Sequence, residues 1–480
     1  MSRVLANSGI YTIISLLQKG VNFLLVPLLT AYLSPKDYGI VAVITAINAF
    51  LNVIYLLSLN GCLNRFYYEY EDDKEKVKVL FGTVVTFVFL FSIAISIILF
   101  VGHKYFLDPF LDEVEFYPYM VLGLISVLFN PVFTIYQNTL QARQQGKRFG
   151  KNNMMFFLTN LVLLLIFIVA LGMKAEGVLA SIAITNVVFF IMTISRFGKE
   201  IKFGIDFLVL RKALVYSLPL VPHSISGVST AMIDRVFINN MLSTATTGIY
   251  NLGSTFGGVV FLVASGVQQA FVPWFNQKVK QDKKQEIAIF ASGIIQVYCM
   301  LALGLSLFSE NIIAWVTPPS YHKAWYIVPI IAFAFVFHSL YYFFSTPFFY
   351  DIDGKGSRSL PIYTILSALI NVFLNFVLIR TYGFLGAALA TLIAKVFLAL
   401  ILMFSYKKFV DIAYNLKQLL LVPLIFLMLS AIAYIPNIDL FLKAALFFIV
   451  ILTQGFFNRK NLEFLRVRIL TKLKKTKGFD

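Results

Sequence analysis

The feature that most constrains this chain is a series of fourteen apolar stretches, each long enough to cross a bilayer as a helix. A hydrocarbon core of about 30 Å takes roughly 20 residues of helix to span. Hydrophobic residues make up 59% of the chain and charged residues 13%, which is too little charge for a water-soluble surface. We therefore predict an all-α polytopic membrane protein with about fourteen transmembrane helices, near residues 8–32, 38–62, 79–101, 117–138, 152–173, 176–195, 212–235, 246–272, 288–308, 324–350, 359–380, 383–405, 417–435 and 439–457.

The distribution of Lys and Arg predicts the orientation of these helices. Of the forty basic residues, thirty-one lie on the side that carries both chain ends and seven lie on the other side. Cytoplasmic loops are enriched in Lys and Arg, so both termini are predicted to be cytoplasmic. The net charge of +17 then reflects topology, and no nucleic-acid partner is expected.

An internal repeat appears when the chain is aligned with itself at an offset of 209 residues. Residues 33–39 then fall on 242–248, and each segment has Leu-Ser, four intervening residues and then Gly. Gly177 falls on Gly386 at the same offset. Six helices is an even number, so the two copies enter the membrane the same way round, as parallel repeats of an alternating-access transporter do. We predict three domains: a six-helix bundle at 1–210, its repeat at 211–410, and an appended helix pair with a basic cytoplasmic tail at 411–480.

Polar residues at helical spacing mark the first two helices of each half as facing water, substrate or another helix. Hydrogen bonding between helices is the structural alternative. Lys19 lies about 16 Å into the first helix, close to the bilayer midplane. A cation there costs about 2.5–3.5 kcal/mol, so either an anionic ligand group or a buried ion pair should compensate.

The seventh predicted helix contains three ionisable candidates for coupling or gating, Asp234, Arg235 and His223. The adjacent Asp234 and Arg235 form a gate, a coupling site or a pair that neutralises itself. Histidine side chains can titrate near neutral pH, so His223 is a candidate for proton coupling. The sequence leaves open whether Lys395 and His338, also near mid-depth, are functional.

Three prolines are candidate hinges, because each removes a backbone hydrogen bond from a membrane helix. They are Pro27, Pro219 and Pro222.

No motif for ATP binding, metal ligation or nucleophilic catalysis occurs in a suitable setting. We therefore expect no catalytic residue, no metal and no cofactor. Transport would instead be coupled to a gradient of H⁺ or Na⁺, to the membrane potential or to the substrate gradient.

Short motifs resemble the polysaccharide-transport branch of the multidrug/oligosaccharidyl-lipid/polysaccharide exporter superfamily, the Wzx-type flippases. They are Asn7-Ser8, Pro27, the turn 33–39, Asp234-Arg235 followed by Gly248-Ile249-Tyr250, and Gly-Lys in the loops at 146–147 and 354–355. The last two helices exceed the twelve of many such flippases and are similar to those of fourteen-helix members, which include the lipid II flippases.

The resemblance implies a transporter, not an enzyme, of the bacterial cytoplasmic (inner) membrane. Its substrate would be an undecaprenyl-pyrophosphate-linked oligosaccharide such as an O-antigen or capsule repeat unit, moved from the inner to the outer leaflet by alternating access. Membrane lipids, a polysaccharide polymerase and chain-length proteins are the further implied partners. Cations and amides suit a diphosphate and sugar hydroxyls, and the substrate-binding candidates are Lys19, Asn22, Asn52, Arg65 and Gln268. A lipid II-type flippase and an ion-coupled multidrug exporter of the same fold are the alternatives.

The topology can be checked with single cysteines at Lys74, Arg148, Lys280 and Lys472, all predicted to be cytoplasmic. A membrane-impermeant thiol reagent added outside intact cells should label none of them, whereas it should label a cysteine at Lys104. Labelling of any of the four would contradict the predicted orientation.

Overall fold

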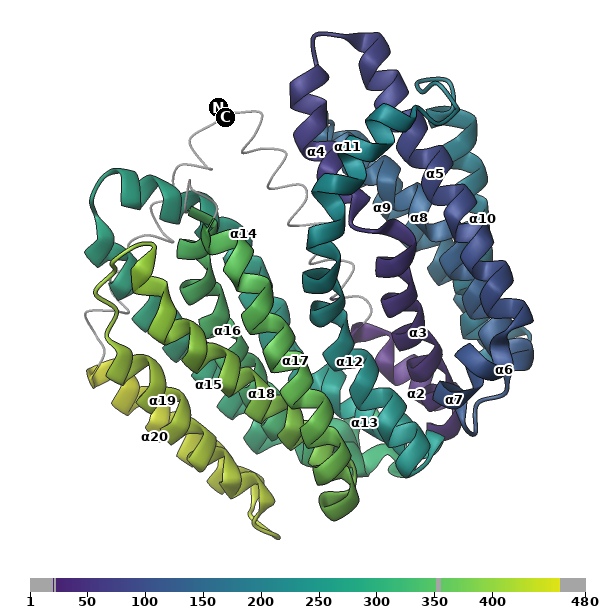
Figure 1. Cartoon of the computed structure of the whole chain (residues 1–480). Coiled ribbons are helices and arrows are strands. Elements are labelled where there is room, and N and C mark those ends of the chain that lie inside the picture. Colours follow the sequence, from purple (N-terminus) through teal and green to yellow (C-terminus); the bar gives the residue numbers. More distant parts are fainter. Residues whose placement is uncertain (1–19, 21–22, 351–354, 458–480) are drawn as a thin grey trace, which may run out of the picture. The chain divides into compact units, whose positions relative to one another are not determined.

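In the computed structural model (Figure 1), the structure describes residues 20, 23–350 and 355–457. Every regular element among these residues is a helix. Eleven of these helices are long and apolar enough to cross a membrane, and they coincide with the second to sixth and eighth to thirteenth predicted helices. The predicted all-α, polytopic fold class is confirmed.

The first and last predicted helices are not among these eleven. Most of the stretch 8–32 lies outside the described residues, and its described end is α2 (Val26–Tyr32). The last stretch forms α20 (Leu440–Phe457), whose apolar part, Leu440–Gln454, is shorter than the other spans.

The seventh predicted helix is interrupted. A 3-10 turn, η3 (Leu218–Leu220), separates α11 (Phe207–Ser217) from α12 (Val221–Met241). Pro219 lies in this turn and Pro222 lies in the first turn of α12. Neither proline can donate a backbone hydrogen bond, which explains a break at this place.

The second predicted helix, 38–62, is also two helices. α3 (Pro35–Leu56) ends where Leu57 and Ser58 adopt left-handed conformations, with φ of 46° and 56°, and α4 (Leu59–Tyr70) follows. Such a conformation costs an L-residue roughly 1–2 kcal/mol, so tertiary packing must impose the break. The prediction of one continuous helix over residues 38–62 is therefore wrong.

Residue contacts divide the chain into two compact units. Unit 1 comprises residues 1–251 and 375–384, and unit 2 comprises 252–374 and 385–480. Unit 1 extends past the predicted domain boundary at 210/211 because α12 packs along α3. Contact units group residues that pack together, whereas the first two predicted domains are copies of a sequence repeat. The contact units therefore do not test the predicted boundary between the copies, which stays a prediction.

Unit 1 is built around α8, which packs against α3, α4, α5, α9 and α10. Two apolar clusters flank α8, one containing Phe81 and Tyr136 and the other containing Ile44 and Leu124. Besides the helices already given, unit 1 contains α5 (Lys74–Val101), α6 (His103–Phe106), α7 (Asp108–Leu111), η1 (Phe116–Met120), α8 (Val121–Ala142), α9 (Gly146–Leu165), η2 (Ile166–Ala170) and α10 (Ala175–Phe197).

Unit 2 is built around α15 and α16, whose buried residues form its apolar core. α13 (Thr244–Gly257) and α17 (Lys355–Tyr382) contribute residues to both units. The helices of unit 2 are α14 (Val259–Lys280), α15 (Lys284–Val316), η4 (Pro319–Ile327), α16 (Val328–Tyr350), α18 (Phe384–Ser405), η5 (Tyr406–Lys408), α19 (Leu416–Ser430), η6 (Ala431–Tyr434) and α20.

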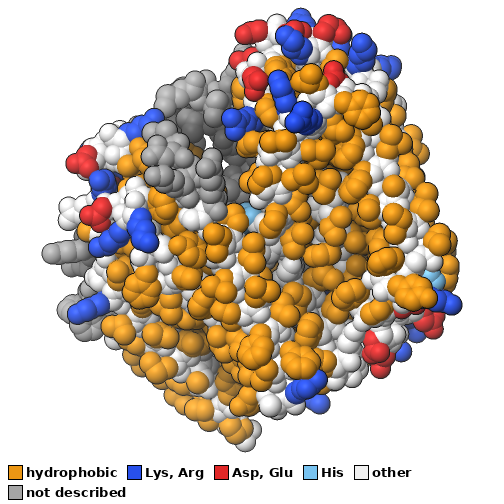
Figure 2. Space-filling model, in the orientation of Figure 1, with side chains coloured by type: hydrophobic (Ala, Val, Ile, Leu, Met, Phe, Trp, Pro, Cys, Tyr) orange, Lys and Arg blue, Asp and Glu red, His pale blue; other side chains and the backbone are white. Residues whose placement is uncertain are grey.

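Large hydrophobic side chains are exposed along the outer helices of both units, as on α5 and α9. Figure 2 shows these side chains covering the helices, with Lys, Arg, Asp and Glu gathered at helix ends. An exposed apolar surface of this extent fits a lipid environment.

The two halves of the internal repeat touch where α3 and α13 begin. A Cβ atom on Gly39 would lie 1.9 Å from the carbonyl oxygen of Thr244, and one on Gly248 would lie 2.0 Å from that of Pro35. At the repeat offset of 209, Pro35 corresponds to Thr244 and Gly39 to Gly248. Each contact is thus repeated with the roles exchanged, which is the signature of a two-fold relation.

The starts of these two helices are capped in the same way. Ser34 Oγ accepts a hydrogen bond from the Asp37 backbone N–H at 3.2 Å, and Ser243 Oγ accepts one from that of Thr246 at 3.1 Å. Side-chain caps satisfy N–H groups that the first helical turn leaves free. The repeat found in the sequence therefore corresponds to a repeated local structure.

Replacing Gly39 with Ala should destabilise the protein, because the new methyl group meets backbone atoms that no rotamer change can move aside. We expect a loss of about 1–3 kcal/mol, the usual range for overpacking, seen as a lower thermal unfolding midpoint in detergent. The matched control is Gly227→Ala on α12, where nothing lies within 4 Å of an added Cβ. Equal midpoints for the two variants would contradict the close approach.

Candidate functional site

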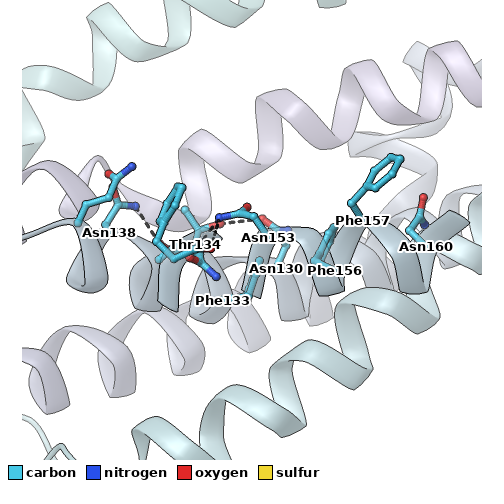
Figure 3. Close-up of a pocket in the computed structure, with 11 residues that line it drawn as sticks. Asn130, Phe133, Thr134, Asn138, Asn153, Phe156, Phe157 and Asn160 are labelled. Atoms are coloured by element: carbon cyan, nitrogen blue, oxygen red, sulfur yellow. Dashed lines mark hydrogen bonds between the residues drawn. The ribbon is translucent and has the colours of Figure 1, made fainter. Parts of the chain in front are cut away.

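A cavity of about 440 Å³ lies in unit 1 between α8 and α9 (Figure 3). Its volume falls within the range of about 300–1,000 Å³ that is usual for ligand pockets. Its lining, called here the amide groove, consists of Asn130, Phe133, Thr134, Gln137, Asn138, Gln141, Phe149, Asn153, Phe156, Phe157 and Asn160. Six of these side chains are amides, four are phenylalanines, and none is charged.

Helical spacing explains how the sequence builds this groove. On α8, Asn130, Thr134, Asn138 and Gln141 follow one another at steps of three or four and share one face. Phe149, Asn153, Phe156 and Asn160 do the same on α9, and Figure 3 shows the labelled groups in a row. From residue 130 to 141 the groove follows α8 for about 16 Å.

Hydrogen bonds hold one end of the groove in place. Thr134 Oγ1 donates to Asn130 Oδ1 at 3.1 Å, and Asn130 Nδ2 donates to Asn186 Oδ1 on α10 at 2.8 Å. Asn186 Nδ2 donates in turn to Ser126 Oγ at 2.9 Å. The orientation of the Asn130 amide is therefore set by Thr134 within the groove and by Asn186 outside it.

Gln137 lies at the centre of the lining and is only 7% exposed. Its Oε1 accepts a hydrogen bond from Asn153 Nδ2 at 3.3 Å. Its Nε2 is buried and has no hydrogen-bond partner among the residues that the structure describes. A buried donor left unpaired costs about 1–3 kcal/mol, so this amide group is suited to a ligand that brings an acceptor.

The substrate-binding residues predicted from the sequence are only partly described. Lys19 and Asn22 lie outside the described residues. Asn52 on α3 is half-buried, and its Oδ1 has no partner within the described part of the chain. Arg65 is exposed on α4 and its guanidinium carbon lies 5.0 Å from the centre of the Tyr216 ring.

Gln268 lies in unit 2, on α14, and its Oε1 is buried with no partner in the described residues. Asn52 and Arg65 belong to separate helices of unit 1. No hydrogen bond between described residues links any two of these three side chains. Their joint role in binding stays a prediction.

Asp234 is 3% exposed, and protein groups engage both of its carboxylate oxygens. Tyr250 Oη donates to Oδ2 at 2.7 Å, and Asn375 Nδ2 donates to Oδ1 at 2.9 Å. Arg235 makes different contacts: its Nε donates to Asn251 Oδ1 at 3.0 Å and a terminal nitrogen donates to the Ala231 carbonyl at 2.6 Å. In the described structure the two neighbours thus have separate partners.

Of the remaining candidates, His223, Pro219 and Pro222 lie at the break between α11 and α12. His223 is half-buried in the first turn of α12, and its carbonyl accepts a hydrogen bond from Ser226 Oγ at 2.8 Å. Pro27 lies in the first turn of α2. The coupling role of His223 and the hinge role of the prolines stay predictions. Among the described residues, no group of three or more His, Cys, Asp or Glu could hold a metal ion.

The amide groove was not predicted from the sequence. The signal was present as two polar stripes, one from Asn130 to Gln141 and one from Asn153 to Asn160. Each stripe alone is also what helix-to-helix hydrogen bonding produces. Only the side-by-side packing of α8 and α9 makes a cavity of them.

Comparison with known proteins adds the family. Residues 4–279 match the family of polysaccharide biosynthesis proteins. The Lsg locus putative protein 1 of Haemophilus influenzae is 22% identical over 326 residues, which are 65% of this chain and 77% of that protein. The probable low-salt glycan biosynthesis flippase Agl15 of Haloferax volcanii is 23% identical over 52% of this chain and 53% of its own length.

Among solved structures, the lipid II flippase MurJ in an inward closed conformation has a similar fold. The TM-score is 0.72 at 15% sequence identity, and the match covers 96% of this chain and 99% of that one. The family match spans more than half of the chain and contains the whole amide groove. This chain is a member of the polysaccharide biosynthesis protein family, with the fold of a multi-pass membrane transporter.

Proposed function

We propose that this protein moves an undecaprenyl-pyrophosphate-linked oligosaccharide from the inner to the outer leaflet of a bacterial cytoplasmic membrane. The observation that carries the proposal is the likeness in fold to a lipid II flippase over almost the whole of both chains. The polysaccharide biosynthesis family and a relative named as a glycan biosynthesis flippase support it.

The proposed substrate has three parts that need different surroundings. Its polyprenyl tail is apolar and can remain in the bilayer. Its diphosphate and glycan would lose their hydration in hydrocarbon, so the protein must supply charge and hydrogen bonds along the path. Lys19 and Arg65 are the proposed partners of the diphosphate, and amides are those of the glycan. No bond is made or broken, so the activity is transport rather than catalysis.

The two alternative functions differ in what the cavity must recognise. A multidrug exporter that takes organic cations needs a carboxylate in the cavity, and the lining of the amide groove has none. The buried Asp234 already accepts hydrogen bonds from Tyr250 and Asn375. These observations favour a glycan substrate. A lipid II-type substrate differs from an oligosaccharide of capsule or O-antigen type only in its sugar and peptide part.

Lys19→Ala should abolish transport while the protein still inserts into the membrane, because no other cation lies nearby on the first helix. Lys19→Arg should retain part of the activity, since the charge remains but the donor geometry changes. The measurement is the amount of surface glycan in cells whose only copy of the protein is the plasmid-borne variant. Immunoblots of the membrane fraction verify that the variant is inserted.

The matched control for this experiment is Lys36→Ala, which removes an exposed lysine at the start of α3. It should leave surface glycan at the normal level. Normal glycan with Lys19→Ala as well would show that Lys19 is structural.

Asp234→Asn tests the proposed coupling to H⁺ or Na⁺. The Asn amide retains the shape of the side chain and can still hydrogen-bond to Tyr250, so the protein should fold. Transport of lipid-linked oligosaccharide into proteoliposomes should fall by tenfold or more and become insensitive to an imposed H⁺ or Na⁺ gradient. Tyr250→Phe, which keeps the charge, should retain most of the gradient dependence. An unchanged, gradient-dependent rate in Asp234→Asn would exclude Asp234 as the coupling site.

A further inference from the structure

We propose that the amide groove binds the neutral glycan of the transported lipid, with sugar hydroxyls hydrogen-bonded to its amides and sugar C–H faces packed on its phenylalanine rings. The inference rests on the proposed function, since it names the part of the substrate that one site in unit 1 recognises. None of the residues that the sequence assigned to binding belongs to the lining of this site.

The absence of charge in the lining decides which part of the substrate fits. A diphosphate binds where Lys or Arg neutralises its oxygens, and a cation binds where carboxylates do. All eleven lining side chains are uncharged. The ligand is therefore neutral, and a chain of hexose or acetamido-hexose units is the neutral part of a lipid-linked oligosaccharide.

The amides match the hydroxyl groups of such a glycan. Each amide both donates and accepts hydrogen bonds, as each hydroxyl does. Gln137 supplies a buried Nε2 donor that is unpaired in the described part of the chain. Asn138 also lines the groove, and its Nδ2 donates to the Thr134 carbonyl at 2.8 Å, so its Oδ1 is the group left to accept a hydrogen bond. A polyprenyl tail in the same place would leave these groups unsatisfied, and hydrocarbon offers them no replacement.

The phenylalanines provide the apolar half of the site. The rings of Phe133 and Phe156 stack at 5.0 Å with 10° between their planes, and Phe189 packs edge-on against both, at 5.3 and 5.1 Å. Pyranose rings carry C–H groups on their flat faces and pack well on aromatic rings held in this way. Along α9, phenylalanine rings and amides alternate from Phe149 to Asn160. Such an arrangement suits a sugar, which has apolar ring faces and polar hydroxyl groups at its edges.

The position of the groove suits loading from the inner leaflet. One end, at Gln141 and Phe149, adjoins the α8–α9 turn, which the charge distribution predicts to be cytoplasmic. Lys147 and Arg148 are exposed just beyond this end, at the level where a lipid diphosphate would remain among headgroups. The glycan would lie along α8 while its diphosphate stays at the interface.

The test compares two probes on the full-length protein in nanodiscs. One is the lipid-linked oligosaccharide extracted from cells that produce it, and the other is undecaprenyl pyrophosphate, which has no sugar. Gln137→Met removes the central amide at nearly constant volume. It should weaken binding of the first probe about tenfold, the effect of losing one or two hydrogen bonds, and leave binding of the second unchanged.

The matched control is Gln296→Met, which replaces another fully buried glutamine, on α15 in unit 2, outside the groove. It should change neither affinity. Asn138→Leu, at a half-buried position of the lining, provides a second variant if Gln137→Met does not fold, as judged by thermal unfolding. It should show the same selective loss.

The outcomes separate this inference from the proposed function. Equal weakening of both probes, or no change in either, would overturn the assignment of the groove to the glycan. If the unsubstituted protein binds the oligosaccharide probe no better than the sugar-free lipid and does not transport it, the proposed function itself fails.

Discussion

The tightest constraint in unit 1 is the close approach of α3 and α13 at Gly39 and Gly248. The absence of two side chains lets backbone meet backbone there, and a Cβ on either glycine would lie within 2.0 Å of a carbonyl oxygen. The crossing joins the start of the second repeat copy to the first. Together with the packing of α12 along α3, it accounts for the continuation of the contact unit beyond residue 210 into α13.

A second constraint is that buried polar groups in a membrane protein need partners, because hydrocarbon supplies none. Asp234 satisfies it within the protein, through Tyr250 and Asn375. Gln137, which lines the cavity, does not: its Nε2 is buried and has no partner in the described structure. The Asp234 carboxylate thus has its hydrogen bonds within the protein, whereas the Gln137 amide still lacks one. This difference underlies the different roles proposed for the two sites.

Tyr250, in the Gly-Ile-Tyr motif that follows Asp234-Arg235, donates a hydrogen bond to Asp234. The coupling or gating roles predicted for Asp234 and Arg235 stay predictions. Sequence-based prediction of the site rested on local signals of this kind. It missed the amide groove, because Asn130 on α8 and Asn153 on α9 line one cavity only when the two helices lie side by side. The distance between stripes on different helices is a property of packing, which no spacing within one helix encodes.

The sequence by itself determined that the chain is an all-α polytopic membrane protein, and it predicted about fourteen helices arranged with two parallel repeat copies. These properties follow from hydrophobic length and from local residue order, which act within single helices. Only the tertiary structure decided where helices break, as at Leu57 and Ser58, where the contact units divide, and where polar stripes enclose a cavity. Those features arise from contacts between segments distant in the chain, where packing overrides the preferences of individual residues.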